Sequence, residues 1–167
     1  MLLSGRRLTA SRGLVVELRL EVFTSLWARS DGETRGYRVV AEDGRPWRDD
    51  DLDEVGVHVL GVVGTTHRSD AVQADGFQPG EPVILMPEPD NAFDPWALGV
   101  LDVRLGAQAG YVSATRSRAL VEEMVHRPLH ALVLVEHRAQ SRRVGLRVAA
   151  SFAPLLASPD EPTSEVC

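Results

Sequence analysis

Apolar and polar residues alternate along several stretches of this chain, and the alternation predicts β-strands. Within residues 13–24, every second position from 14 to 22 is apolar, while Glu17, Arg19 and Glu21 stand between these positions. A period of two is typical of a strand with one face in the core and the other in water. Apolar and β-branched runs predict further strands at residues 37–41, 55–64, 82–86, 96–103, 108–112, 130–136 and 144–150.

Helical patterns are fewer. Residues 113–125 carry an apolar stripe, begin with a serine suited to capping, and are followed by Pro128. A shorter helix is expected within residues 65–76, with Ser69 or Asp70 as its cap. Because turns rather than repeated crossover helices connect the strands, the pattern favours a mainly β fold with one or two helices, arranged as a small, partly open β-barrel.

The sequence divides into three parts. Residues 1–54 hold the first two strands and a polar, acidic connector over 45–54, and we expect a β-rich extension whose role the sequence does not indicate. The apolar runs become denser in residues 55–152, where we expect the main domain. Residues 153–167 are rich in proline, serine and acidic residues, and we expect a disordered acidic tail there.

The charge balance limits the kind of partner. The net charge is −6, which argues against coating nucleic acid through bulk electrostatics. Eight of the 24 acidic residues lie in 49–54 and 160–165, whereas residues 58–152 hold nine arginines and ten acidic residues. A nearly neutral domain suits a short strand or an end better than a long duplex. Lysine is absent, so every basic side chain is a planar guanidinium suited to phosphate and to stacking.

Several other functions lack the residues that they need. No apolar run is long enough to span a membrane, and residues 1–13 do not have the order of a signal peptide, so we expect a cytoplasmic protein without a membrane partner. The single cysteine, Cys167, excludes an internal disulfide framework and a cysteine-based zinc site. Pro128 breaks the helix that would align His126 and His130 as zinc ligands. We expect no cofactor.

Residues 88–95 (EPDNAFDP) place three acids, an amide and an aromatic ring between two predicted strands. Glu88, Asp90 and Asp94 are hard oxygen donors that could hold a metal ion, as in a nuclease. The alternative is turn chemistry, in which Asp and Asn side chains bond their own backbone and the prolines fix the bend. Taken alone, these residues favour the turn.

Together with its neighbours, this segment resembles the HIRAN domain. That family shows a glycine-ended strand, a stretch similar to EPDNPYDPNAIRV, and a GxxGYV turn that enters a helix. The chain has VVG at 62–64, EPDNAFDPWALGV at 88–100 and GAQAGYV at 106–112, followed by its best helix. The order and the spacing both fit, and the resemblance covers about residues 55–152.

The resemblance implies an OB-like barrel that binds single-stranded DNA and is not catalytic by itself. In the eukaryotic fork-remodelling translocases that carry it, the domain prefers the free 3′ end. Phe93 falls on the family's stacking aromatic residue, and Asp94 falls on the aspartate that accepts from the terminal hydroxyl. A flat ring offers a π-face to any base, and an ionised carboxylate selects a hydroxyl over a phosphate by repulsion.

The remaining positions differ from the family or add to its pattern. Thr66-His67 replaces an Arg-Tyr pair, and we expect His67 to stack and Arg68 to reach phosphate. Asn91 and Tyr111 complete the predicted nucleic-acid site, although Tyr111 could equally cover the barrel mouth. Trp96 replaces an asparagine; of its two roles, packing into the core or adding a stacking surface, we expect core packing. Weaker candidates for phosphate contacts are Arg116, Arg118 and, in a predicted hairpin turn, Arg142 and Arg143.

Three functions follow from these observations, in descending order. The first is a non-catalytic module that recognises single-stranded DNA or its 3′ end, with any helicase or nuclease supplied by another chain. The second is a protein-interaction or scaffold domain whose DNA pocket has decayed, because the net charge is acidic and the Arg-Tyr pair is missing. The third is a metal-dependent nuclease or phosphoesterase centred on Glu88, Asp90 and Asp94, which ranks last because no lysine and no nucleophile–base pair accompany the acids.

Overall fold

Ten strands and two α-helices build the part of the chain that the computed structural model describes, residues 6–11, 15–41, 43–104 and 106–159. The strands are β1 (Arg6–Ser11), β2 (Val15–Leu26), β3 (Glu33–Val40), β4 (His58–Val63), β5 (Pro82–Pro87), β6 (Leu98–Asp102), β7 (Gln108–Val112), β8 (His130–Ala139), β9 (Arg142–Ser151) and β10 (Leu156–Pro159). The helices are α1 (Asp49–Glu54) and α2 (Ala114–Met124), with short 3-10 helices η1 (Thr65–Arg68), η2 (Ala71–Gln73) and η3 (Asp75–Phe77).

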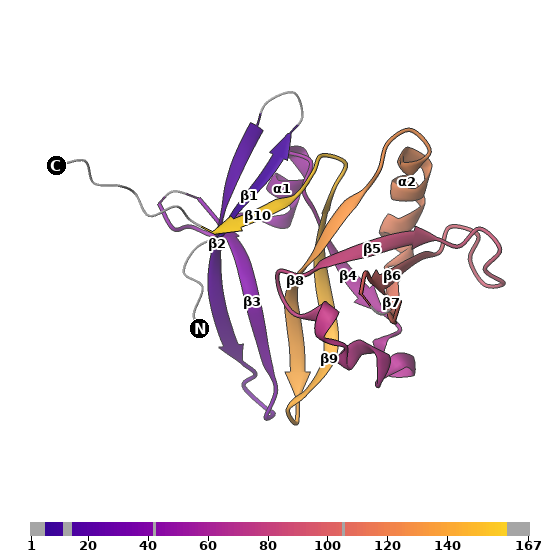
Figure 1. Ribbon diagram of the computed structural model, residues 1–167. Helices are drawn as coiled ribbons and strands as arrows, with labels where there is room; N and C mark the ends of the chain where they lie inside the picture. The colour runs from indigo at the N-terminus through magenta and orange to yellow at the C-terminus, as the bar shows by residue number, and fades with distance from the viewer. Residues whose placement is uncertain (1–5, 12–14, 42, 105, 160–167) are drawn as a thin grey trace.

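Six antiparallel strands close into a barrel (Figure 1). The ring runs β8-β5-β6-β7-β4-β9, and the pairing of β8 with β9 closes it. The β8–β9 hairpin turns at Gln140 and Ser141, which both have a positive φ, as the tight turns that suit twisted hairpins require. The prediction of a mainly β fold with an OB-like barrel is confirmed, and the ring closes where the sequence predicted a partly open barrel.

The barrel is filled by apolar side chains from all around the ring. Leu98, Val100, Val133 and Val148 are fully buried inside it. Helix α2 packs one face, with Leu120, against the same core, and the loop from β4 to β5 inserts Phe77, which is 0% exposed. Truncating a buried ring of this kind to alanine costs about 3–5 kcal/mol, so the loop that carries η1 to η3 is fixed to the barrel.

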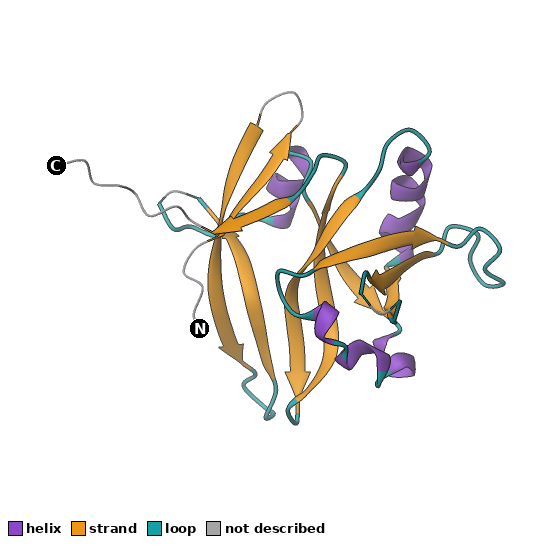
Figure 2. Cartoon of the chain, viewed as in Figure 1, coloured by secondary structure: helices purple, strands orange, loops and turns teal. Residues whose placement is uncertain are grey.

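A second layer of strands extends from the barrel (Figure 2). Strands β10, β1, β2 and β3 follow one another in the sheet, and β3 pairs with β8 between Glu33–Gly36 and residues 135–138. A separate core lies between this extension and the barrel, where Leu20, Leu52 and Leu134 are buried. One edge of β8 is therefore shared, because β5 pairs with it at residues 131–132 and β3 pairs further along.

Three local features differ from the sequence-based expectation. Residues 49–54, which were expected in a connector, form α1, whose first turn holds three aspartates that suit the positive end of the helix dipole. Three 3-10 helices replace the one short helix expected over 65–76. Residues 156–159, which were expected in the acidic tail, form β10 and pair with β1, while residues 160–167 lie outside the described residues.

No helix in the described part of the chain has both the length and the apolar character needed to cross a membrane.

Candidate nucleic-acid interface

The loop between β5 and β6 is held by a side chain from within it. Oδ1 of Asn91 accepts hydrogen bonds from the backbone N–H of Phe93 at 3.0 Å and of Asp94 at 3.2 Å. The N–H of Asn91 itself donates to the carbonyl of Glu88 at 3.0 Å. These bonds are the turn chemistry expected of an Asn between two prolines. They fix the backbone of the segment that carries Phe93.

Phe93 projects its ring into solvent from this fixed backbone. Its side chain is 99% exposed, more than any other large hydrophobic residue in the described part of the chain. The loop itself projects from the barrel on the side opposite to β1, β2 and β3 (Figure 1). A flat ring on a rigid turn loses little conformational freedom when another planar group stacks on it. The arrangement therefore suits a stacking platform.

Asp94 follows Phe93 in the loop, and only one of its carboxylate oxygens is used in the turn. Its Oδ1 accepts the backbone N–H of Trp96 at 2.8 Å. Its Oδ2 accepts no hydrogen bond from the residues that the structure describes. One carboxylate oxygen therefore orders the loop, and the other remains available to a donor outside the chain.

Glu88 connects the loop to the barrel. Its Oε2 accepts hydrogen bonds from Nδ2 of Asn91 and from the hydroxyl of Tyr111, both at 3.0 Å, and its Oε1 accepts one from Nε2 of Gln108 at 3.3 Å. The hydrogen bond from Asn91 is the largest cause that lowers the pKa of Glu88, and Tyr111, Gln108 and the charge of Arg68 add to it against the effect of burial. Glu88 is therefore ionised at neutral pH, with its oxygens occupied.

Tyr111 is placed by a close approach of two backbones. A Cβ atom at Gly110 would lie 2.2 Å from the carbonyl oxygen of Val63, so only glycine lets β7 pass β4 this closely. Tyr111 then carries the guanidinium of Arg68 over its ring, at 5.6 Å from the ring centroid. This contact joins β7 to η1, which begins after Gly64 at a φ of 79°.

Five of the six predicted site residues are thus connected. Arg68 lies over Tyr111, Tyr111 and Asn91 both bond Glu88, and Asn91 holds the backbone of Phe93 and Asp94. Among the described residues, Arg68 has no carboxylate within ion-pair distance.

The sixth predicted residue, His67, precedes Arg68 in η1. Its side chain is exposed and its ring makes no hydrogen bond or ion pair with a described residue. The contacts therefore do not connect His67 to the other five residues.

The prediction that Trp96 packs into the core is wrong. Its side chain is half-buried and belongs to neither core cluster. Instead, the guanidinium of Arg118 lies over the indole at 5.1 Å from the ring centroid, and Arg118 also pairs with Glu122 at 3.1 Å. Trp96 therefore adds a second aromatic surface to the loop, with a cation on one side of it.

The other arginines considered for phosphate are used within the fold. Arg116 pairs with Asp53 at 2.8 Å, and Arg142 pairs with Asp70 at 3.2 Å. Arg143 was expected in a hairpin turn, but it lies in β9, is 4% exposed and bonds Glu136 at 2.6 Å. Its place opposite a buried carboxylate corrects the expectation of a solvated turn residue.

The acidic residues of the loop are not gathered into a single ligand set in the described part of the chain. Glu88, Asp90 and Asp94 are not among any group of three His, Cys, Asp or Glu side chains close enough to hold a metal ion, and the described residues contain no such group. The three neutral donors on Glu88 explain its presence without a metal. Glu88 therefore fixes Tyr111 and Asn91, and Asp94 takes part in forming the turn.

A closed OB-like barrel that presents an exposed aromatic ring on a fixed turn and a partly free carboxylate defines a β-barrel binding module. The model of the HIRAN domain matches residues 55–156, and the chain belongs to this family. HIRAN domains are generally DNA-binding modules, so the family implies nucleic-acid binding for this domain.

Part of the chain is similar to a solved structure. A crystal structure of a protein from Lactobacillus plantarum is 23% identical, covers 55% of this chain and 89% of its own, and superposes with a TM-score of 0.46. A search of curated proteins gave no match.

Proposed function

We propose that the domain binds the end of a single DNA strand at the β5–β6 loop, without catalysing a reaction on it. The observation that carries this proposal is the exposed ring of Phe93 on a backbone fixed by Asn91. Stacking of a base on an aromatic ring is tolerant of sequence, because every base has a π-face. The terminal base of the strand stacks on Phe93.

Asp94 gives the site its preference for a free hydroxyl. Oδ2 of Asp94 accepts the hydrogen bond of the terminal 3′-hydroxyl, while Oδ1 keeps its bond to the N–H of Trp96. A terminal phosphate brings negative charge to the same carboxylate and is repelled, with Glu88 and Asp90 nearby in the loop adding to the effect. Discrimination comes from this repulsion as much as from the hydroxyl bond.

Arg68 supplies the attraction for the strand. Arg68 is the one basic residue among the five connected site residues. Its guanidinium stacks on Tyr111, and its N–H donors have no carboxylate partner among the described residues. A guanidinium can bind a phosphate through two parallel hydrogen bonds. His67, which precedes it on η1, offers a further exposed ring for the penultimate base. Any helicase or nuclease that acts on the end is supplied by another chain.

A direct test uses fluorescence anisotropy with short oligonucleotides of one sequence that differ only in their ends. We expect a single strand with a 3′-hydroxyl to bind more tightly than the same strand with a 3′-phosphate, and blunt duplex to bind more weakly than either. Equal affinity for the two 3′ ends would contradict the role of Asp94. The absence of binding to all three probes would favour the protein-interaction function instead.

A further inference from the structure

A polar cavity lies where the N-terminal strands meet the barrel, away from the β5–β6 loop. It has a volume of about 320 Å³ and is lined by β2 and β3, by the ends of β8 and β9, and by the Gln78-Pro79 turn that leads into β5. The loop of Phe93 follows the opposite end of β5. A strand of six residues spans about 20 Å, so the two places are separate.

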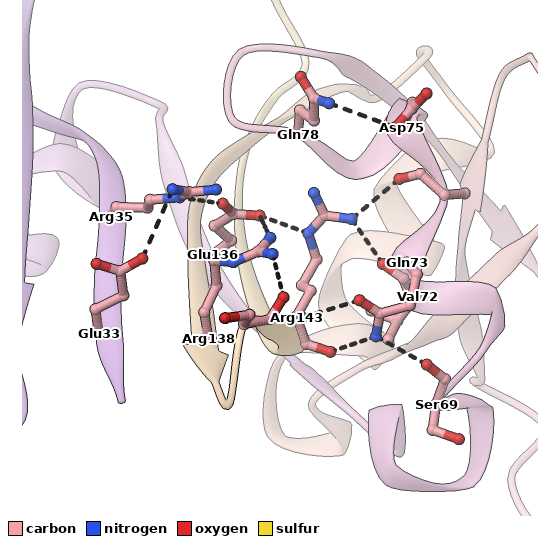
Figure 3. Close-up of polar contacts among 12 residues, drawn as sticks. Glu33, Arg35, Ser69, Val72, Gln73, Asp75, Gln78, Glu136, Arg138 and Arg143 are labelled. Carbon is pink, nitrogen blue, oxygen red and sulfur yellow. Dashed lines mark hydrogen bonds and ion pairs between the residues drawn. The ribbon is translucent and has the colours of Figure 1, made fainter. Parts of the chain in front are cut away.

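Three arginines surround a single carboxylate at this cavity (Figure 3). Glu136, which is 1% exposed, accepts Nε of Arg35 from β3 at 2.5 Å and Nε of Arg143 from β9 at 2.6 Å. Arg138, on the same strand as Glu136, approaches its Oε2 with a terminal nitrogen at 3.5 Å. Burial acts to raise the pKa of Glu136, but the hydrogen bonds from Arg35 and Arg143 outweigh it and lower the pKa.

The cluster keeps a surplus of positive charge. The cavity is lined by three guanidinium groups and one carboxylate, and the next acid, Glu33, lies 3.6 Å from Arg35 at the margin. One arginine would be enough to neutralise Glu136, and three like charges around it repel one another at this distance. The ion pair between Arg35 of β3 and Glu136 of β8 joins the N-terminal strands to the barrel. Arg138 lies on β8 itself, so it is not needed to join the two parts.

The guanidinium groups also keep unused donors. Arg143 donates Nε to Glu136 and one terminal nitrogen to the carbonyls of Val72 and Ala74 at 2.8 and 3.0 Å, which fixes its plane. Its other terminal nitrogen has no acceptor among the described residues. The close-up shows this nitrogen pointing away from both sets of partners (Figure 3). A rigid guanidinium edge that faces a cavity suits an oxyanion with several acceptor oxygens.

Aromatic side chains continue the cavity on its other side. Phe23 and Tyr37 line it together with the arginines, and both also line an adjoining cavity of about 190 Å³ that contains Trp47. Planar surfaces therefore lie directly beside the cluster of cations. This combination matches the two parts of a nucleotide, an anionic phosphate and a flat base.

We propose that this cavity is a second ligand site, which binds the phosphate of a nucleotide at Arg35, Arg138 and Arg143 and its base against Phe23. The nucleotide is either free or part of a single strand, because both present the same chemistry. The site uses β2 and β3, which lie outside the family match, and it does not rest on the proposed role of the β5–β6 loop.

The test is isothermal titration calorimetry of the full chain with four probes: thymidine 5′-monophosphate, thymidine, inorganic phosphate, and an eight-nucleotide thymidine strand. We expect the monophosphate to bind and thymidine not to bind. Arg35→Gln and Arg138→Gln each remove one charge-assisted contact and leave Arg143 on Glu136, so each should weaken the monophosphate at least about tenfold. Phe23→Leu should weaken it while leaving the weaker binding of inorganic phosphate unchanged.

Arg45→Gln is the matched control, because Arg45 is 86% exposed, lines neither cavity and, among the described residues, forms its ion pair with Asp43. Unchanged affinity in both Arg35→Gln and Arg138→Gln, or an equal loss in Arg45→Gln, would overturn the proposal. So would the failure of the wild-type chain to bind the monophosphate.

The thymidine strand then separates the two sources of the nucleotide. If Arg35→Gln weakens both the strand and the monophosphate, the site accepts nucleotides within a strand; if it weakens the monophosphate alone, the ligand is a free nucleotide. Phe93→Ala should leave the monophosphate affinity at its wild-type value. Loss of the monophosphate in Phe93→Ala but not in the arginine variants would place all binding at the β5–β6 loop and contradict the second site.

Discussion

The hydroxyl of Tyr111 donates a 3.0 Å hydrogen bond to Oε2 of Glu88, the residue from which the loop of Phe93 departs. Because the ring of Tyr111 also lies beneath Arg68, this single phenol connects strand β7, helix η1 and the β5–β6 loop. A movement of any one of these three segments would therefore strain or break a contact with Tyr111. The segments that carry Phe93 and Arg68 are therefore connected to each other through Glu88 and Tyr111.

Phe93 should be dispensable for folding and necessary for binding. Phe93→Ala removes a ring that is 99% exposed, so the free energy of unfolding should change by less than about 0.5 kcal/mol. Loss of one stacked base should weaken the binding of a single strand roughly 5- to 100-fold. Urea unfolding and anisotropy measure the two effects. Val125→Ala, at a side chain that is 80% exposed, is the control and should change neither.

Asp94→Asn should separate the charge of Asp94 from its part in the turn. The amide oxygen can still accept the N–H of Trp96, so the melting temperature should stay close to that of the wild type. Removal of the negative charge should relieve repulsion of a terminal phosphate, so the preference for a 3′-hydroxyl should shrink or disappear. Competition between the two oligonucleotides measures this preference. A preference as large as in the wild type would show that another residue reads the end.

Asn91→Ala should loosen the loop. It removes the acceptor of two backbone N–H groups and one donor to Glu88 in a half-buried position, which should cost about 1–3 kcal/mol. DNA binding should fall with it, because Phe93 is no longer held. Hydrogen exchange at the amides of Phe93 and Asp94 should accelerate. Ser30→Ala, which removes a similar side-chain acceptor from an exposed turn, should leave these amides unchanged.

The salt dependence of binding should report the small number of cations at the loop. For single strands, the slope of log K against log salt is about −0.7 for each phosphate neutralised, so we expect a shallow slope of about −1. Arg68→Gln should reduce its magnitude by about 0.7, because Arg68 is the connected cation without a carboxylate partner. Arg45→Gln should leave the slope unchanged. A steep slope would instead require contacts well beyond the loop.

Glu136 should contribute to the pH dependence of stability. Its pKa is lowered in the folded chain, so its contribution is present above the pKa of the unfolded state and is lost as the pH falls through the lower, folded value. Glu136→Gln should cost about 3–5 kcal/mol at pH 7, because it leaves buried Arg143 without its carboxylate. The difference in the free energy of unfolding between Glu136→Gln and the wild type should narrow below about pH 4.3. A gap independent of pH would contradict the ionised pair.

Glu122→Gln is the surface counterpart of this change. Glu122 is 52% exposed and pairs with Arg118 within one helix, so its loss should cost less than about 0.5 kcal/mol at any pH.

The strands could be predicted because their signals are local. The alternation at residues 14–22 and the β-branched run that became β4 needed no knowledge of the partner strand. Helix α1 was missed because six residues of mostly acidic sequence resemble a connector, although Leu52, which is 2% exposed, marks its buried face. The turn at Asn91 could also be predicted, since its residues are adjacent in sequence.

The contacts that organise the site could not be predicted, because they join distant segments. Glu88 was considered as a metal ligand, but its partners Gln108 and Tyr111 lie 20 and 23 residues further along the chain. Arg143 was expected in a turn because the sequence does not show that its guanidinium contacts both Glu136, seven residues away across the β8–β9 hairpin, and the carbonyl of Val72, 71 residues away. The contact with Val72 exists only once the loop from β4 to β5 packs on the barrel.

The sharing of β8 has a consequence for how the chain avoids self-association. Strand β3 covers the backbone groups of β8 at residues 135–138, and the apolar side chains of Leu134 and Val135 are buried in the same place. A fragment cut to residues 55–156 would present that row of donors and acceptors as an open edge, which is a template for pairing with another copy. The N-terminal strands thus protect the barrel from edge-to-edge association by covering this edge of β8.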